Sequence, residues 1–127
     1  ASNLYFRWRL PEEKVVLPLD SQKTYRVFEN LLVNITKYAM PRTRVYVDME
    51  NDEKRVRISM KNISASELNF NPSEITERFV RGDVSRNTEG SGLGLAIAKS
   101  FVELQGGNLQ IMVDADLFTV EIVFPKP

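Results

Sequence analysis

The sequence predicts an α/β fold, a two-layer sandwich in which helices pack on one face of a mixed β-sheet. Three observations predict it. Strand-like alternation occurs near both ends and in the middle of the chain, helical spacing of apolar residues occurs in two segments, and Gly and Pro residues mark several boundaries. Because 127 residues with 43% hydrophobic residues suit one adequate core, residues 1–127 are expected to form a single domain.

Two short strand patterns come first. The stretch "LYFRWRL", residues 4–10, alternates apolar and basic side chains as a half-buried strand does. The stretch "VVLPL", residues 15–19, is a second short strand pattern with Pro18 marking an edge. Ala1, Ser2 and Asn3 are excluded from the fold argument as a cleavage remnant.

A long amphipathic helix is predicted next, over residues 21–39. Asp20 offers an N-cap and Pro41 closes the helix. Its apolar positions, which recur at intervals of three and four, are Tyr25, Phe28, Leu32, Ile35 and Ala39.

Two hairpins and a second helix complete the fold. The first hairpin pairs residues 43–50 with 54–62 around "NDE", and the second pairs residues 108–114 with 117–124 around Asp114 to Asp116. Between them, "GLGLAIAKSFVELQ" is helical and ends at the C-cap signal "GG", Gly106 and Gly107.

Composition excludes several function classes. The chain has no Cys and no His, which removes disulfides, thiolate or imidazole metal sites and triads with an imidazole base. Its formal net charge is zero, so we expect no nucleic-acid partner. No apolar run reaches membrane-spanning length and no signal peptide is apparent, so the chain is expected to be cytoplasmic.

The alternating glycines of "RNTEGSGLGLAIAKS" predict a phosphate-binding turn. Gly90, Gly92 and Gly94 let a backbone approach an anion, and a helix beginning near Gly92 presents free N–H groups and a positive dipole end. No buried strand precedes these glycines and no G-K-[ST] follows them, which argues against dinucleotide and P-loop motifs. The polar residues 69–90 before them suggest a lid over a nucleotide.

One face of the long helix supplies a second candidate half of the site. Asn30, Asn34, Lys37 and Tyr38 fall within roughly a third of the helix circumference, away from the predicted apolar positions. A solvated face would also carry Asn and Lys, and that reading stays open. Amide oxygens are nevertheless hard ligands for Mg²⁺, and a lysine complements phosphate charge.

Three stretches, "RVFENLLVNITKYA", "ITERFVRGD" and "EGSGLGLAIAKSFVELQGG", resemble in order and spacing the N, F and G2 boxes of the catalytic ATP-binding domain of bacterial sensor histidine kinases. The resemblance covers nearly the whole chain and implies the Bergerat fold. It implies that Asn34 binds Mg²⁺, that Lys37 contacts phosphate, that Tyr38 packs near the nucleoside and that Arg81 reaches phosphate from the lid. The positions it implies for ATP binding are Asn30, Asn34, Lys37, Tyr38, Asn62, Arg81, Arg86, Gly90, Gly92, Leu93 and Gly94.

The chain departs from the family pattern at the adenine box. The family usually has Asp-x-Gly-x-Gly after the strand "VRISM", whereas this chain has Asn62, with Ser64 and Ser66 at the glycine positions. A neutral amide can accept and also donate a hydrogen bond, so adenine recognition is expected in altered form, or the site is degraded. The hairpin "DADLF" also lacks the usual Gly-x-Gly-Thr.

The resemblance implies a kinase module that passes the γ-phosphoryl group of Mg–ATP to a histidine on a separate dimerisation helical hairpin of the same kinase. It further implies that a response regulator is an indirect partner and that the isolated domain is a monomer. Membrane anchoring of the intact protein is compatible with the resemblance. The alternatives are a nucleotide-sensing module without transfer and a protein-serine kinase of the anti-sigma-factor type. Asn30 matches the position of a general-base glutamate in topoisomerase and chaperone ATPases, so slow hydrolysis is expected.

Overall fold

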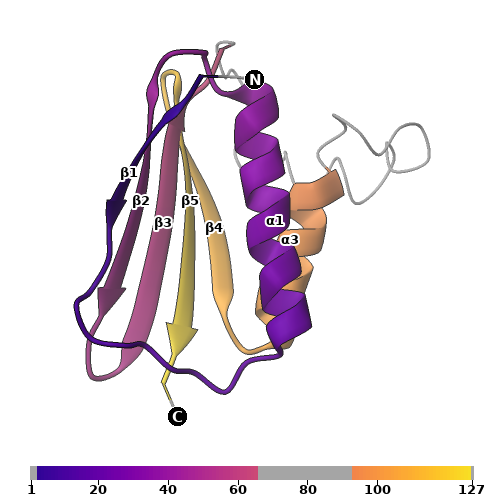
Figure 1. The fold of residues 1–127 in the computed structure, drawn as a ribbon. Helices are drawn as coiled ribbons and strands as arrows, with labels where there is room; N and C mark the ends of the chain where they lie inside the picture. The colour runs from indigo at the N-terminus through magenta and orange to yellow at the C-terminus, as the bar shows by residue number, and fades with distance from the viewer. Residues whose placement is uncertain (1–2, 66–92, 127) are drawn as a thin grey trace.

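A computed structural model describes residues 3–65 and 93–126, and in this part of the chain five strands form one mixed sheet (Figure 1). The strand order is β1-β2-β3-β5-β4, and helices α1 and α3 lie side by side on one face of the sheet. The bounds are β1 Tyr5–Arg9, α1 Ser21–Tyr38, β2 Arg44–Asn51, β3 Arg55–Ile63, α3 Leu93–Leu104, β4 Asn108–Asp114 and β5 Leu117–Pro125. The predicted two-layer α/β sandwich with a mixed sheet is confirmed.

The strand predicted over residues 4–10 forms as β1, which is shorter by one residue at each end. It pairs in parallel with β2, with Tyr5 opposite Arg44 and Arg9 opposite Asp48. Parallel neighbours need a crossover connection, and α1 supplies it. The other strand pairs among the described residues, β2–β3, β3–β5 and β4–β5, are antiparallel.

The strand predicted over residues 15–19 is wrong. These residues form no strand, although Val15, Leu17 and Leu19 are half-buried and pack against the core. Residues 15–19 are therefore a connecting segment. Every second side chain of this segment packs on the edge of the core, which produces the alternation that suggested a strand. Without a neighbouring strand to supply a hydrogen-bond ladder, alternation does not make a strand.

Helix α1 begins as predicted. The carboxylate of Asp20 accepts a hydrogen bond from the backbone N–H of Lys23 at 2.9 Å. That backbone hydrogen bond is the main reason the pKa of Asp20 lies below its ordinary value.

The buried side of α1 is rotated from the predicted one. Val27, Leu31 and Ile35 are buried. Phe28 and Leu32 are only partly buried, and Tyr25 is 67% exposed. Val27 and Leu31 come from positions between the predicted apolar row and the asparagine row, so the asparagines border the core rather than face away from it. Periodicity alone placed the helix correctly but missed its rotation about its own axis.

Both predicted hairpins form. In the β2–β3 turn, the carboxylate of Asp52 accepts hydrogen bonds from the backbone N–H groups of Lys54 and Arg55, each at 2.8 Å, and these lower the pKa of Asp52. In the β4–β5 turn, Ala115 adopts a left-handed φ of 56°. The second turn therefore closes without the glycines that the family usually has there, with one non-glycine residue in the left-handed region.

Helix α3 ends at the predicted glycines. Gly106 has a φ of 82°, its N–H donates to Glu103, and the N–H of Gly107 donates to Val102 at 2.9 Å. These two bonds form a Schellman cap. Within the described residues, no helix is both long and apolar enough to cross a membrane.

The core lies between the helices and the sheet. It fills the side of the sheet to which alternate residues of β3 point, which are Val56, Ile58, Met60 and Asn62. The largest fully buried side chains are Leu31, Leu109, Ile122, Val27, Val45, Val56 and Val102.

Candidate functional site

The first turn of α3 lies against the middle of α1. An ideal Cβ on Gly94 would lie 3.5 Å from Cβ of Asn30 and 3.6 Å from its Oδ1. Two predicted site residues, far apart in sequence, are therefore neighbours. The first-turn N–H groups of α3, which an α-helix leaves without intrahelical partners, begin beside the Asn30 amide.

Asn30 carries an unpaired polar atom at this junction. The side chain is half-buried, and its Nδ2 is buried with no hydrogen-bond partner among the described residues. A buried donor without a partner is costly, by about 1–3 kcal/mol. Such an atom fits a site that is completed by an acceptor from outside the described residues.

The other predicted residues of α1 continue toward its C-terminus. Asn34 lies one turn beyond Asn30 and is half-buried, whereas Lys37 and Tyr38 are exposed. Exposure to solvent therefore increases along this side of α1, from the half-buried amides to the exposed lysine. All four residues lie within about a third of the circumference of α1.

Backbone hydrogen bonds join the end of α1 to the end of β3. The N–H of Ala65 donates to the carbonyl of Tyr38 at 2.8 Å, and the N–H of Met40 donates to Ile63 at 2.7 Å. Ala39 and Ser64 form an isolated antiparallel bridge. The C-terminal turn of α1 is therefore held beside the end of β3, where Asn62 lies.

Asn62 is 3% exposed, and its Oδ1 is buried without a hydrogen-bond partner among the described residues. Its cross-strand neighbour is Phe118 on β5, which is buried on the same face. The N–H of Ser64 donates to the carbonyl of Asp116 in the β4–β5 turn at 2.7 Å. An acceptor is thus held next to an apolar ring on the helix-covered side of the sheet.

These features fit a purine nucleotide. Asn62 offers an unpaired acceptor beside an apolar surface, as a base with an exocyclic amino group requires, and Asn30 offers an unpaired donor near a helix N-terminus, as phosphate requires. Three buried side-chain atoms lack partners in the described residues, and the third, Oδ1 of Asn51, lies at the far end of β2. Two of the three therefore belong to the predicted site.

Several predicted residues lie outside the described residues: Ser66, Arg81, Arg86, Gly90, Gly92 and the whole predicted lid, 69–90. Leu93 is described as the first residue of α3. Groups of three or more acidic, His or Cys residues able to hold a metal ion do not occur in the part of the chain that the structure describes.

Comparison with known families agrees with this geometry. Residues 19–127 match the family described as histidine kinase-, DNA gyrase B-, and HSP90-like ATPase. The chain belongs to this family of ATPases.

Among individual proteins, the chain is similar to bacterial sensor proteins. The chain is 37% identical to the "Probable sensor protein PcoS" of Escherichia coli over 77% of this chain and 22% of that protein. It is 32% identical to the sensor protein VanSC of Enterococcus gallinarum over 94% of this chain and 34% of that protein. The chain therefore spans about a fifth to a third of the length of these curated relatives.

Solved structures agree. The mycobacterial sensor histidine kinase MprB superimposes with a TM-score of 0.78 at 27% identity, over 99% of this chain and 86% of that chain. The chain thus corresponds to the catalytic ATPase domain of a two-component sensor histidine kinase, and the predicted resemblance is confirmed.

The sequence did not identify Phe118 as a residue of the candidate site. Phe118 lies directly across from Asn62, but the alternation in residues 117–124 fixes neither the register of β5 nor its partner strand. The missing glycine pattern in "DADLF" was the available signal that this wall of the site differs.

Proposed function

We propose that this domain binds Mg–ATP between α1, the first turn of α3 and the end of β3, and donates its γ-phosphoryl group to a histidine on another domain. The observation that carries the proposal is the pair of unpaired buried amide atoms, Oδ1 of Asn62 and Nδ2 of Asn30. In this proposal they lie at two ends of one site, and Asn62 faces the base whereas Asn30 faces the phosphates.

Adenine would be recognised by Asn62. Its buried Oδ1 accepts a hydrogen bond from the exocyclic amino group, and Phe118 provides apolar surface beside it. A neutral amide lacks charge assistance, so this bond is weaker than the one an aspartate would form, by about 1 kcal/mol. Tyr38, which is held beside the end of β3, would pack near the nucleoside.

The phosphates would lie at the start of α3. Gly94 leaves the backbone there open, and the helix dipole favours negative charge. Lys37 would add a positive charge, and the side chain of Asn34 would hold Mg²⁺ together with phosphate oxygens and water. When bound, Mg²⁺ neutralises charge on the phosphates. The phosphate contacts would be completed by Arg81 and Arg86 from the lid, by Gly90 and Gly92 from the glycine turn, and by Leu93 at the start of α3.

Transfer rather than hydrolysis follows from Asn30. An amide cannot take a proton from water, and a positioned base contributes about 10²- to 10⁴-fold to such a reaction. An imidazole needs no such help, because its nitrogen is itself nucleophilic near neutral pH. The imidazole nitrogen attacks the γ-phosphorus, the bond to the β–γ bridging oxygen breaks, and ADP leaves.

The acceptor comes from outside this sequence, which contains no His. We propose that it lies on a dimerisation helical hairpin of the same kinase and that a response regulator receives the phosphoryl group afterwards. The domain would act in the cytoplasm, where ATP is supplied, and the intact protein could be anchored in the membrane.

The test supplies γ-labelled ATP to this domain together with the dimerisation hairpin of the same kinase. The expected product is a labelled hairpin whose phosphoryl group is lost in acid and retained in base, as a phosphohistidine is. Asn34→Ala should abolish labelling, and Ser100→Ala on the exposed side of α3 should leave it unchanged. Acid-stable label would indicate a serine kinase. ATP binding without label would indicate a sensing module, and either outcome would refute transfer to histidine.

A further inference from the structure

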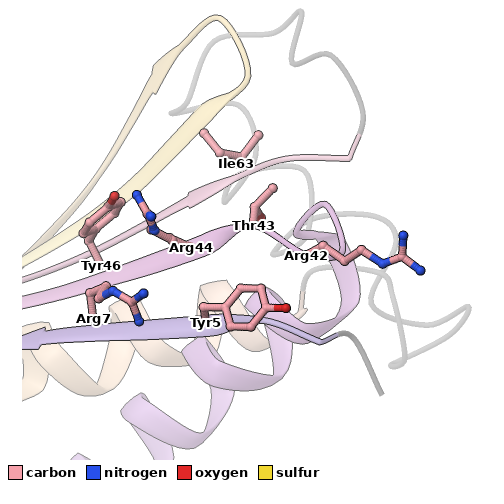
Figure 2. Close-up of a pocket in the computed structure, with 7 residues that line it drawn as sticks. All are labelled: Tyr5, Arg7, Arg42, Thr43, Arg44, Tyr46 and Ile63. Carbon is pink, nitrogen blue, oxygen red and sulfur yellow. The ribbon is translucent and has the colours of Figure 1, made fainter.

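An open hollow lies on the face of the sheet opposite the helices (Figure 2). Its volume is about 560 Å³, and it spans the start of β1, the start of β2 and the end of β3. The residues that line it are Tyr5, Arg7, Arg42, Thr43, Arg44, Tyr46 and Ile63. We call Tyr5, Arg7, Arg42, Arg44 and Tyr46 the arginine–tyrosine surface.

Two arginines farther along this face of the sheet, Arg9 and Arg57, are paired with carboxylates. Nη2 of Arg9 donates a hydrogen bond to Oδ2 of Asp48 at 3.1 Å. Hydrogen bonding to the Asp48 carboxylate raises the pKa of Arg9. Arg57 lies 3.1 Å from Glu50 and 3.4 Å from Glu121. Carboxylates on the same face therefore balance the charges of Arg9 and Arg57.

The arginines of the hollow differ. Among residues 3–65 and 93–126, no carboxylate forms an ion pair with Arg7, Arg42 or Arg44. The cross-strand register places Tyr5 opposite Arg44 and Arg7 opposite Tyr46, so cations and aromatic rings alternate across β1 and β2. Figure 2 shows Arg7, Arg44 and Tyr46 gathered on the two neighbouring strands.

We propose that the arginine–tyrosine surface binds an acidic segment of a partner protein. Arginine guanidinium groups bind carboxylates in a bidentate manner, and both Arg and Tyr are enriched among the residues that dominate protein interfaces. Tyr5 is 52% exposed and Tyr46 37% exposed, so both rings are available for contact. The free cations supply the charge complement that acidic side chains need.

Nucleic acid fits this surface less well. Even with Lys61, which lies opposite Tyr46, the four cations neutralise few phosphates. The net charge of the chain is zero, so the long-range attraction that drives binding to a nucleic-acid backbone is small. A protein segment that combines carboxylates with apolar side chains uses both the arginines and the rings.

This surface is separate from the proposed nucleotide site. Asn62 points to the helix-covered face, whereas its neighbour Ile63 lines the hollow on the opposite face. A partner seated here leaves α1 and α3 uncovered. The proposal therefore does not depend on ATP binding, and the domain can engage both at once.

The test uses a fluorescent peptide of repeated Glu-Glu-Tyr, its Gln-Gln-Tyr counterpart and oligothymidylate as probes for this domain. Binding of the acidic peptide should weaken by about tenfold or more in the double variant Arg7→Gln with Arg44→Gln. The matched control is Arg26→Gln with Arg55→Gln, which removes the same charge from exposed positions elsewhere and should change binding less than about twofold. Melting temperatures verify that both variants remain folded.

A second measurement locates the contact. Backbone amide resonances of Tyr5, Arg7 and Tyr46 should shift on addition of the acidic peptide, and that of Asn34 should not. Equal loss of binding in both double variants, equal affinity for the glutamine peptide, no binding, or shifts centred on Asn34 would each overturn the proposal. Tighter binding of oligothymidylate than of the acidic peptide would assign the surface to nucleic acid instead.

Discussion

At the scale of single residues, Gly94 is a position where the fold tolerates a side chain but the proposed phosphate site does not. An added Cβ would meet Asn30 only at ordinary contact distance, 3.5 Å, so the fold has room for it. Alanine is also the better helix former, by up to about 1 kcal/mol. Nothing in the described structure therefore requires glycine here, whereas close approach of a phosphate to the backbone does.

Gly94→Ala should keep or raise the free energy of unfolding while weakening ATP binding, because the methyl group covers the backbone beside Asn30. Chemical denaturation and titration with Mg–ATP measure the two effects. Ser100→Ala, an exposed change in the same helix, should raise stability similarly and leave ATP affinity unaltered. Unchanged affinity in Gly94→Ala would exclude this glycine from the phosphate site.

At the scale of elements, the two glycines that end α3 are required for different reasons. Gly106 has open space for a Cβ but a φ of 82°, which strains other residues. A Cβ on Gly107 would lie 2.7 Å from the Phe124 ring and 2.9 Å from Cγ1 of Val102, both buried. Strain acts at the first position and overpacking at the second.

Gly107→Ala should lower the free energy of unfolding by about 1–3 kcal/mol, because buried Phe124 and Val102 must move. Gly106→Ala should cost about 1–2 kcal/mol through backbone strain alone. Denaturant titration measures both. Neither change should alter ATP affinity, since this cap lies at the other end of α3 from Gly94. If the Gly107→Ala protein is as stable as the wild type, Phe124 and Val102 do not pack closely enough against Gly107 to exclude a methyl group.

At the scale of the whole molecule, the sequence predicted the sheet, both long helices and the family, because hairpin alternation, caps and box spacing are local signals. It did not predict strand order, the rotation of α1 or the absence of a strand at residues 15–19. Those depend on which elements become neighbours. The contact of Asn30 with the start of α3 and the pairing of Asn62 with Phe118 likewise follow from tertiary packing and β-strand register.

The core of the domain contains a buried polar group, the side chain of Asn62. Oδ1 of Asn62 lacks a partner within the described residues, and such a group costs about 1–3 kcal/mol. Leucine has a similar shape and no unpaired polar atom. If Asn62 serves nucleotide recognition, replacing it with leucine should raise the stability of the domain without nucleotide and weaken its binding of ATP.

The most direct measurement is the melting temperature of the wild type and of Asn62→Leu, each with and without millimolar Mg–ATP. The account predicts that Asn62→Leu melts at a higher temperature than the wild type without nucleotide. It also predicts that Mg–ATP raises the melting temperature of the wild type by mass action but has little effect on the variant. An equal rise in both proteins, or no rise in the wild type, would contradict the claim that Asn62 marks the base end of an ATP site.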